Sequence, residues 1–156
     1  MSGIKNEDPE PAARLMSAVT VEQNFEKAKE FHRKGSLREA VTLYREVLTT
    51  DPGHIDALNN LGVIYLHSND LDMAGANFEK AIRLNPENVN SFYNMACLNA
   101  RKGDISRSLV NLEKALSLDQ SVREWARNDN DLKNLQGDLK FENIIGEQGI
   151  RNAGFE

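Results

Sequence analysis

Apolar, small and turn-forming residues recur at intervals of 34 positions through the middle of the chain. Pro52 and Pro86 lie 34 residues apart, and stepping by the same interval recovers further sets of chemically similar residues. These sets are Gly35, Asn69 and Gly103; Leu37, Leu71 and Ile105; Ala40, Ala74 and Ser108; Tyr44, Phe78 and Leu112; Ala28, Gly62 and Ala96; and Leu48, Ile82 and Leu116. A repeat of this length indicates an array of stacked supersecondary units.

Each repeat is expected to form a helix, a tight turn and a second helix. The recurring glycine or asparagine tolerates the left-handed backbone conformation that ends a helix. The residues that follow it are Ser36, Asp70 and Asp104, which are good N-caps for the second helix. Ser36 and Glu39 also have the spacing of a capping box. The recurring proline then ends the second helix, because proline lacks the amide hydrogen that a helix needs.

A single helical hairpin cannot bury its apolar face, so the units are expected to stack on one another. This arrangement strongly resembles the tetratricopeptide repeat. The residues that carry the resemblance are clearest in the second unit: Leu58, Leu61, Gly62, Tyr65, Ala74, Phe78, Ala81 and Pro86. The resemblance implies an all-α fold, a right-handed α-solenoid of three helix-turn-helix units with a C-terminal helical cap.

The flanking segments leave the repeat register. Before the repeats, Leu15, Met16 and Val19 follow a helical spacing, so the polar leader can form one short helix that either frays or packs as a lid. After them, Ser121 and Glu124 have the pattern of a capping box, and the run DNDLKNLQGDLKF resembles segments that close other arrays of this family. The expected segments are the leader at 1–20, repeat units at 21–54, 55–88 and 89–122, capping helices at 123–146 and a flexible tail at 147–156.

Composition excludes several classes of partner. The 156 residues include 19 Lys and Arg against 24 Asp and Glu, a net charge of −5, which argues against nucleic acid or an anionic membrane as the main partner. No apolar run approaches the roughly 20 residues of a membrane helix. The first residues are too acidic and polar for a secretory signal, so we expect a cytoplasmic protein without membrane insertion.

The sequence offers no catalytic constellation. Cys97 is the only cysteine, which excludes a disulfide framework, and it is expected to be a small packing residue. The histidines have no metal-ligand spacing to another ligand, and His54 is expected in a solvated loop. Phosphate-binding, nucleophile-elbow and zinc-protease motifs are absent from the sequence. We therefore expect no catalytic residue, metal site or cofactor, and a protein that is not an enzyme.

In the family that the repeats resemble, the first helix of each unit lines the concave face. Asparagine side chains there can donate to and accept from the backbone of an extended peptide, because each carboxamide carries both groups. Aromatic residues can anchor an apolar side chain, and a stripe of arginine and histidine can meet a carboxylate. The candidate peptide-binding residues are Phe25, Lys29, Arg33, Asn59, Asn60, His67, Asn90, Tyr93, Asn94 and Arg101.

One subclass of this family clamps chaperone C-terminal tails with a set of Lys, Asn and Arg residues. Asn60 fits that set. The positions that depart from it are Phe25 and Asn90 in place of Lys, Lys29 in place of Asn, and Asn94 in place of a basic residue. We therefore predict that chaperone tails are not the natural ligand.

The sequence favours a non-catalytic adaptor that binds a protein or peptide partner in the concave groove, as an extended peptide or a helix. The alternative is a self-assembling homo-oligomeric scaffold, in which the leader or cap of one chain occupies the groove of a neighbour.

Overall fold

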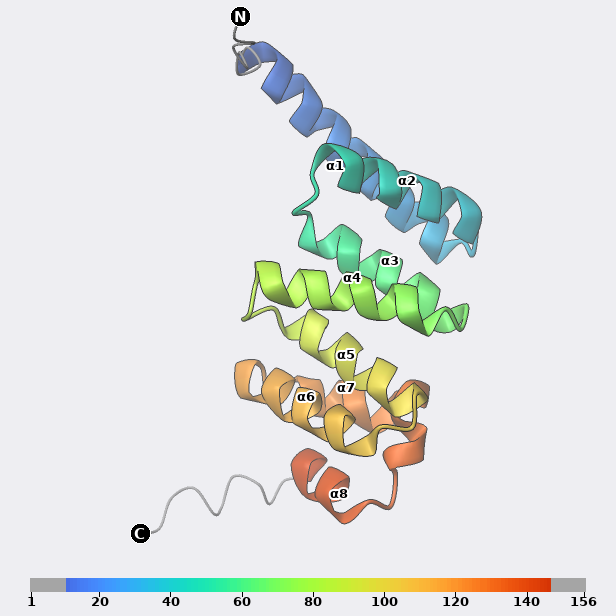
Figure 1. Cartoon of the computed structure of the whole chain (residues 1–156), viewed down its shortest axis with the longest axis vertical. Helices are drawn as coiled ribbons and strands as arrows, with labels where there is room; N and C mark the ends of the chain where they lie inside the picture. Colours follow the sequence, from blue (N-terminus) through green and yellow to red (C-terminus); the bar gives the residue numbers. More distant parts are fainter. Residues whose placement is uncertain (1–10, 147–156) are drawn as a thin grey trace, which may run out of the picture. The chain divides into compact units, whose positions relative to one another are not determined.

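The computed structural model describes residues 11–146, and within this range every regular element is a helix. The helices, labelled in Figure 1, are α1 (Pro11–Arg33), α2 (Leu37–Thr50), α3 (Ile55–His67), α4 (Leu71–Leu84), α5 (Val89–Arg101), α6 (Ile105–Leu118), α7 (Val122–Asn128), the 3₁₀ helix η1 (Asn130–Leu135) and α8 (Leu139–Ile145). The all-α fold class of helix-turn-helix repeats is confirmed. Within residues 11–146, no helix combines the length and apolar character that crossing a membrane requires.

The chain forms two compact units, of which the first ends at Ala57 and the second begins at Leu58, in the first turn of α3. In the first unit, α1 packs against α2. In the second unit, α5 packs against α4 on one side and α6 on the other, and η1 also lies on α5. Helix α8 contacts both α6 and α7. The third repeat is therefore covered by segments that follow it in the sequence.

The turn between the two helices of each repeat has the predicted left-handed residue. Gly35, Asn69 and Gly103 have φ angles of 78°, 63° and 77°. Asn69 is the non-glycine residue with a positive φ within the described part of the chain, and asparagine tolerates this conformation better than most residues.

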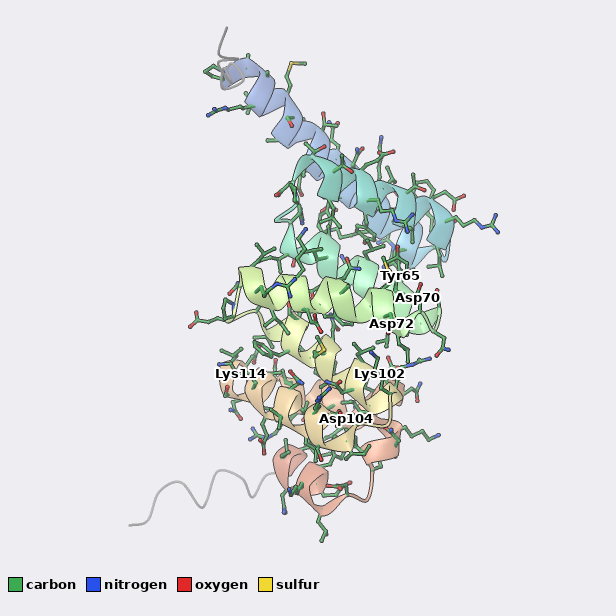
Figure 2. The ribbon with its side chains drawn as sticks, viewed as in Figure 1. Tyr65, Asp70, Asp72, Lys102, Asp104 and Lys114 are labelled. Carbon is green, nitrogen blue, oxygen red and sulfur yellow. The ribbon has the colours of Figure 1, made fainter. Side chains whose placement is uncertain are left out.

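The caps after these turns differ from one repeat to the next. Asp70 and Asp104, labelled in Figure 2, accept hydrogen bonds from the backbone amides of the third residue beyond them, at 3.2 and 3.0 Å. Ser36 has similar backbone angles but makes no side-chain cap bond, so the predicted capping box is wrong there. Ser121 also makes no side-chain cap bond.

Close packing in the second unit depends on the small residues of the repeat. Gly62 lies directly against the ring of Phe78, so that a Cβ atom built on Gly62 would lie 2.4 Å from Phe78 Cε1. In the next repeat, Ser108 Oγ donates a 2.7 Å hydrogen bond to the Ala96 carbonyl, and both residues are fully buried. Small residues at these positions therefore let the helix backbones approach, as expected for the set to which Gly62 and Ala96 belong.

Two expectations for the N-terminal part need correction. Residues 11–20 are the first part of α1, which is continuous to Arg33, instead of a short helix separate from the first repeat. In Figure 1, α1 runs well past α2 toward the N-terminus. His54 is half-buried, and its Nδ1 accepts a 3.2 Å hydrogen bond from the Ala57 amide, so it caps α3 and is not a solvated loop residue. The predicted tail at 147–156 and the first ten residues of the leader lie outside the described residues.

Candidate functional site

The first helix of the third repeat presents a line of polar side chains. Tyr93, Cys97 and Arg101 lie four residues apart on α5, so they share one face of the helix. His67, at the C-terminal end of α3, comes to the same place. We call these four residues the receiving face. Sequence analysis placed Tyr93, Arg101 and His67 among the candidate peptide-binding residues, and the structure brings these three together.

A segment of the chain's own C-terminal region lies on the receiving face. This segment, residues 129–135, is here called the acidic strap. Asp131 Oδ1 accepts a 3.0 Å hydrogen bond from Arg101 Nη1, and Asp131 Oδ2 lies 3.1 Å from His67 Nε2. The Asp131 side chain is 15% exposed, so this ion pair is half-buried and less screened than a surface pair. Arg101 and His67 of the expected stripe thus meet a carboxylate, and that carboxylate belongs to the same chain.

The second carboxylate of the strap binds two uncharged groups. The Tyr93 hydroxyl donates a 2.7 Å hydrogen bond to Asp129 Oδ2, and the Cys97 thiol lies 3.8 Å from the same oxygen. Asp129 Oδ1 accepts a 2.8 Å hydrogen bond from the Asp131 amide, which fixes the first turn of η1. Asp129 therefore both caps η1 and holds it to α5.

These contacts change the acidity of Tyr93 and Cys97. Burial raises the pKa of Tyr93 far above its ordinary value, and the Cys97 thiol and Asp129 carboxylate beside it raise that pKa further. Burial also raises the pKa of Cys97, with a further contribution from Asp129 and Asp131. Cys97 therefore stays a thiol at neutral pH, which is the opposite of what a nucleophilic cysteine needs.

The strap is also anchored by apolar side chains. Leu132 and Leu135 are fully buried, and Asn134 Nδ2 donates a 2.7 Å hydrogen bond to the Ala100 carbonyl at the end of α5. Beside this contact lies an open hollow of about 480 Å³, lined by Ala100, Arg101, Asn130, Asp131, Lys133 and Asn134. Trp125 on α7 meets the Tyr93 ring edge-on, with centroids 5.5 Å apart.

Asn59 supports the structure of the second unit. Its amide nitrogen donates to Asn88 Oδ1 at 3.2 Å and lies 3.0 Å from Ser91 Oγ, and Asn59 is only 4% exposed. These bonds join α3 to the N-terminal end of α5. The Asn59 amide is therefore committed to its neighbours, and the expectation that it reads a peptide backbone needs correction.

The other candidate asparagines of the second unit are more accessible. Asn60 on α3 and Asn94 on α5 are half-buried, and Asn90 at the start of α5 is exposed. Their amide groups are the ones that keep the chemistry expected for recognition of a peptide backbone.

The candidate residues of the first unit differ in exposure. Phe25 is buried against His54, with ring centroids 4.5 Å apart, which leaves little of its surface for a ligand. Lys29 is exposed, and its Nζ lies 5.0 Å from the centre of the Phe25 ring and 2.5 Å from a Glu26 oxygen. Arg33 is exposed at the end of α1. Lys29 and Arg33 both line a hollow on α1 of about 500 Å³.

One cluster has donor atoms of the kind that bind metals. Atoms of Cys97, Asp129 and Asp131 all lie within 4.8 Å of one another. The two carboxylates of this cluster already accept hydrogen bonds: Asp129 from the Tyr93 hydroxyl, and Asp131 from the Arg101 guanidinium, which also balances its charge. We therefore interpret the cluster as the polar contact between the strap and α5.

Asp129 and Asp131 are the site residues that sequence analysis missed. The acidic run that contains them is visible in the sequence, where its pattern predicts a terminal cap. Their partners lie 30 to 64 residues away along the chain. The repeat pattern relates positions within the repeats to one another, and Asp129 and Asp131 lie after the last repeat, so the pattern does not connect them to their partners.

Comparison with known proteins identifies the repeat. Two family models, both described as tetratricopeptide repeat, match residues 55–88 and 77–109. No curated protein matches the sequence.

Solved structures share the fold at low sequence identity. A mutant O-GlcNAc transferase of Thermobaculum terrenum has a TM-score of 0.68 and 23% identity, over 70% of this chain and 21% of that one. The first TPR of Spaghetti (RPAP3), bound to an HSP90 peptide, has a TM-score of 0.64 and 16% identity; the match covers 85% of this chain and 94% of that one. The TPR2B domain of yeast Sti1, in a pHsp70 complex, has a TM-score of 0.67 and 20% identity; the match covers 74% of this chain and 95% of that one.

This chain spans about a fifth of the length of the transferase. The helix-turn-helix units, the left-handed turn residues and the matches over the second and third repeats agree with one another. Residues 55–109 of the chain therefore form tetratricopeptide repeats.

Proposed function

We propose that the chain is a non-catalytic adaptor that binds a protein partner, as an extended peptide or a helix, on the faces of its first helices. The observation that carries this proposal is that the receiving face already accommodates a short segment of polypeptide, Asp129 and the 3₁₀ helix η1, through side-chain contacts. A surface that holds one such segment has the chemistry to hold another. The cytoplasmic location expected from the sequence is part of the proposal.

The accessible asparagines of the second unit extend this surface. Asn60 and Asn94 belong to the first helices of successive repeats, and each offers a donor and an acceptor. A peptide in extended conformation exposes both groups of its backbone, so amides of this kind favour binding with modest selectivity for sequence.

The test is selection of binding peptides from a random peptide library against the full chain. We expect Asn60→Ala with Asn94→Ala to weaken the selected peptides about ten-fold, the effect of losing one or two hydrogen bonds. The matched control is Asn111→Ala with Asn143→Ala, which removes the same groups from α6 and α8. Unchanged affinity of every selected peptide in the Asn60 and Asn94 variant would contradict the assignment of the site.

The proposal does not extend to chaperone tails. The HSP90 peptide and pHsp70 belong to the complexes of the two neighbours. Because this chain departs from the set of Lys, Asn and Arg residues that clamps chaperone tails in one subclass of the family, we predict weak or absent binding of a peptide ending in EEVD. Low-micromolar binding in a titration would show this prediction to be wrong.

A second candidate function is self-assembly, which a different observation favours. Leu15 and Met16, near the start of α1, are 68% and 72% exposed, and Val19 is also exposed on the same helix. Exposed apolar residues gathered on one part of a helix favour contact with another protein surface.

Light scattering at several concentrations tests this candidate. A mass above that of the monomer, restored to the monomer value by Leu15→Gln, Met16→Gln and Val19→Gln together but not by Lys27→Gln, would support self-assembly. A monomer at every concentration would exclude it.

A further inference from the structure

The acidic strap has the features of a bound ligand. Its two carboxylates, two residues apart, reach different groups: Asp131 meets Arg101 and His67, while Asp129 meets Tyr93 and Cys97. These contacts join side chains, so their geometry does not depend on the strap and the repeats belonging to one chain.

We propose that the receiving face is a binding site for an acidic, leucine-containing segment of a partner protein, and that the strap is its internal occupant. This inference rests on the proposed function and names the class of ligand. The segment carries two aspartates two residues apart, followed by leucines at the spacing of Leu132 and Leu135. The strap itself, DNDLKNL, has this pattern.

Charge supports this choice of ligand. Arg101 supplies a fixed positive charge, and its guanidinium side chain is 31% exposed where it meets Asp131. Arginine bonds to carboxylates are among the stronger hydrogen bonds, so a ligand without a carboxylate at this point would leave Arg101 poorly paired. The Tyr93 hydroxyl donates to Asp129, which favours an acceptor at the second position as well.

The covalent link between the strap and the repeats explains why the receiving face is occupied in the intact chain. A segment joined to its own binding site is present at an effective concentration on the order of millimolar. A partner segment of similar affinity must compete with that concentration. The strap therefore masks the receiving face until a tighter or more abundant ligand replaces it.

The test uses a synthetic peptide with the sequence of residues 128–136, NDNDLKNLQ, blocked at both ends and titrated calorimetrically into the full chain. In the chain, Asp129→Ala and Asp131→Ala together remove the charged contacts of the strap and leave both buried leucines in place. We expect this variant to bind the peptide at least about ten-fold more tightly than the wild type, because each charged hydrogen bond that held the strap opposed the peptide.

Three controls separate recognition from general effects. Glu87→Ala with Glu113→Ala makes the same change in net charge at exposed positions and is expected to leave peptide binding at the wild-type level. Adding Arg101→Ala to the strap variant is expected to abolish the gain, since it removes the group that receives the carboxylate. A peptide with asparagine in place of both aspartates is expected to bind at least about ten-fold more weakly than the acidic peptide.

A strap variant that keeps its helical circular dichroism and does not bind the peptide would overturn the proposal, and the strap would then be a structural cap only. If the double variant loses its fold, Asp131→Ala alone serves as the test, because Asp129 still caps η1 in that variant. Library peptides that still bind through Asn60 and Asn94 while the strap peptide fails would leave the proposed function intact. Failure of both sets of peptides would remove both proposals.

Discussion

The contact between Gly62 and Phe78 gives a sharp prediction about stability. A Cβ atom on Gly62 would lie 2.4 Å from Cε1 and 2.8 Å from Cδ1 of the Phe78 ring. Phe78 is fully buried, so its ring has no open space into which it can move. We therefore expect Gly62→Ala to destabilise the second unit.

The size of the effect follows from two opposing contributions. Forcing an extra methyl group into a packed interior costs about 1–3 kcal/mol, and a contact this short against a rigid ring lies at the upper end. Replacing glycine by alanine within a helix stabilises it by up to about 1 kcal/mol. The free energy of unfolding should therefore fall by about 2 kcal/mol.

Gly75→Ala is the matched control on the neighbouring helix α4. Its Cβ atom would lie 3.3 Å from Leu98 Cδ2, the end of a flexible side chain that can shift by a few tenths of an ångström. Here the gain in helix propensity should prevail, and the variant should be at least as stable as the wild type.

Urea unfolding followed by far-ultraviolet circular dichroism measures both variants. Combining Gly62→Ala with Phe78→Leu should cost less than the sum of the two single changes, because the smaller side chain relieves the clash. If Gly62→Ala proves as stable as the wild type, the close approach of the helices is not rigid and the reasoning fails.

Two further predictions concern single side chains. Asp70→Ala should lower the free energy of unfolding by about 1 kcal/mol in urea titrations, whereas Ser36→Ala should cost much less, because Asp70 makes a side-chain cap bond and Ser36 does not. Tyr93 has a pKa raised by folding, so the unfolded chain releases its proton first as the pH rises past the ordinary tyrosine value of about 10. Stability should therefore fall with rising pH in that range, and unfolding titrations across it should show a smaller fall for Tyr93→Phe; an equal fall in both proteins would contradict the prediction.

The repeat itself could be predicted because its signals are local. Gly35, Asn69 and Gly103 take up the left-handed conformation that their residue types indicated. The capping box at Ser36 was wrong for a reason that sequence patterns do not resolve. Ser36 and Asp70 share a backbone conformation and are both good N-cap residues, yet only Asp70 makes the side-chain cap bond.

The site was only partly predictable because half of it lies outside the repeat. Stepping by 34 residues found Tyr93 and Arg101 on one face, since helical spacing fixes which residues share a surface. The same reasoning predicts that the Asn59 amide is available to a peptide, although it makes tertiary hydrogen bonds to Asn88 and Ser91. Asp131 belongs to no periodic set, so only the three-dimensional structure joins it to Arg101.

The edge-on contact between Trp125 and Tyr93 gives the molecule an optical marker. Trp125 is the single tryptophan of the chain, so its emission comes from the junction of α7 with the third repeat alone. If this junction opens while the repeats stay helical, the emission maximum shifts toward longer wavelength before the helical signal changes. The order of these two signals along one denaturation curve then shows whether the C-terminal segments separate from the array first or unfold together with it.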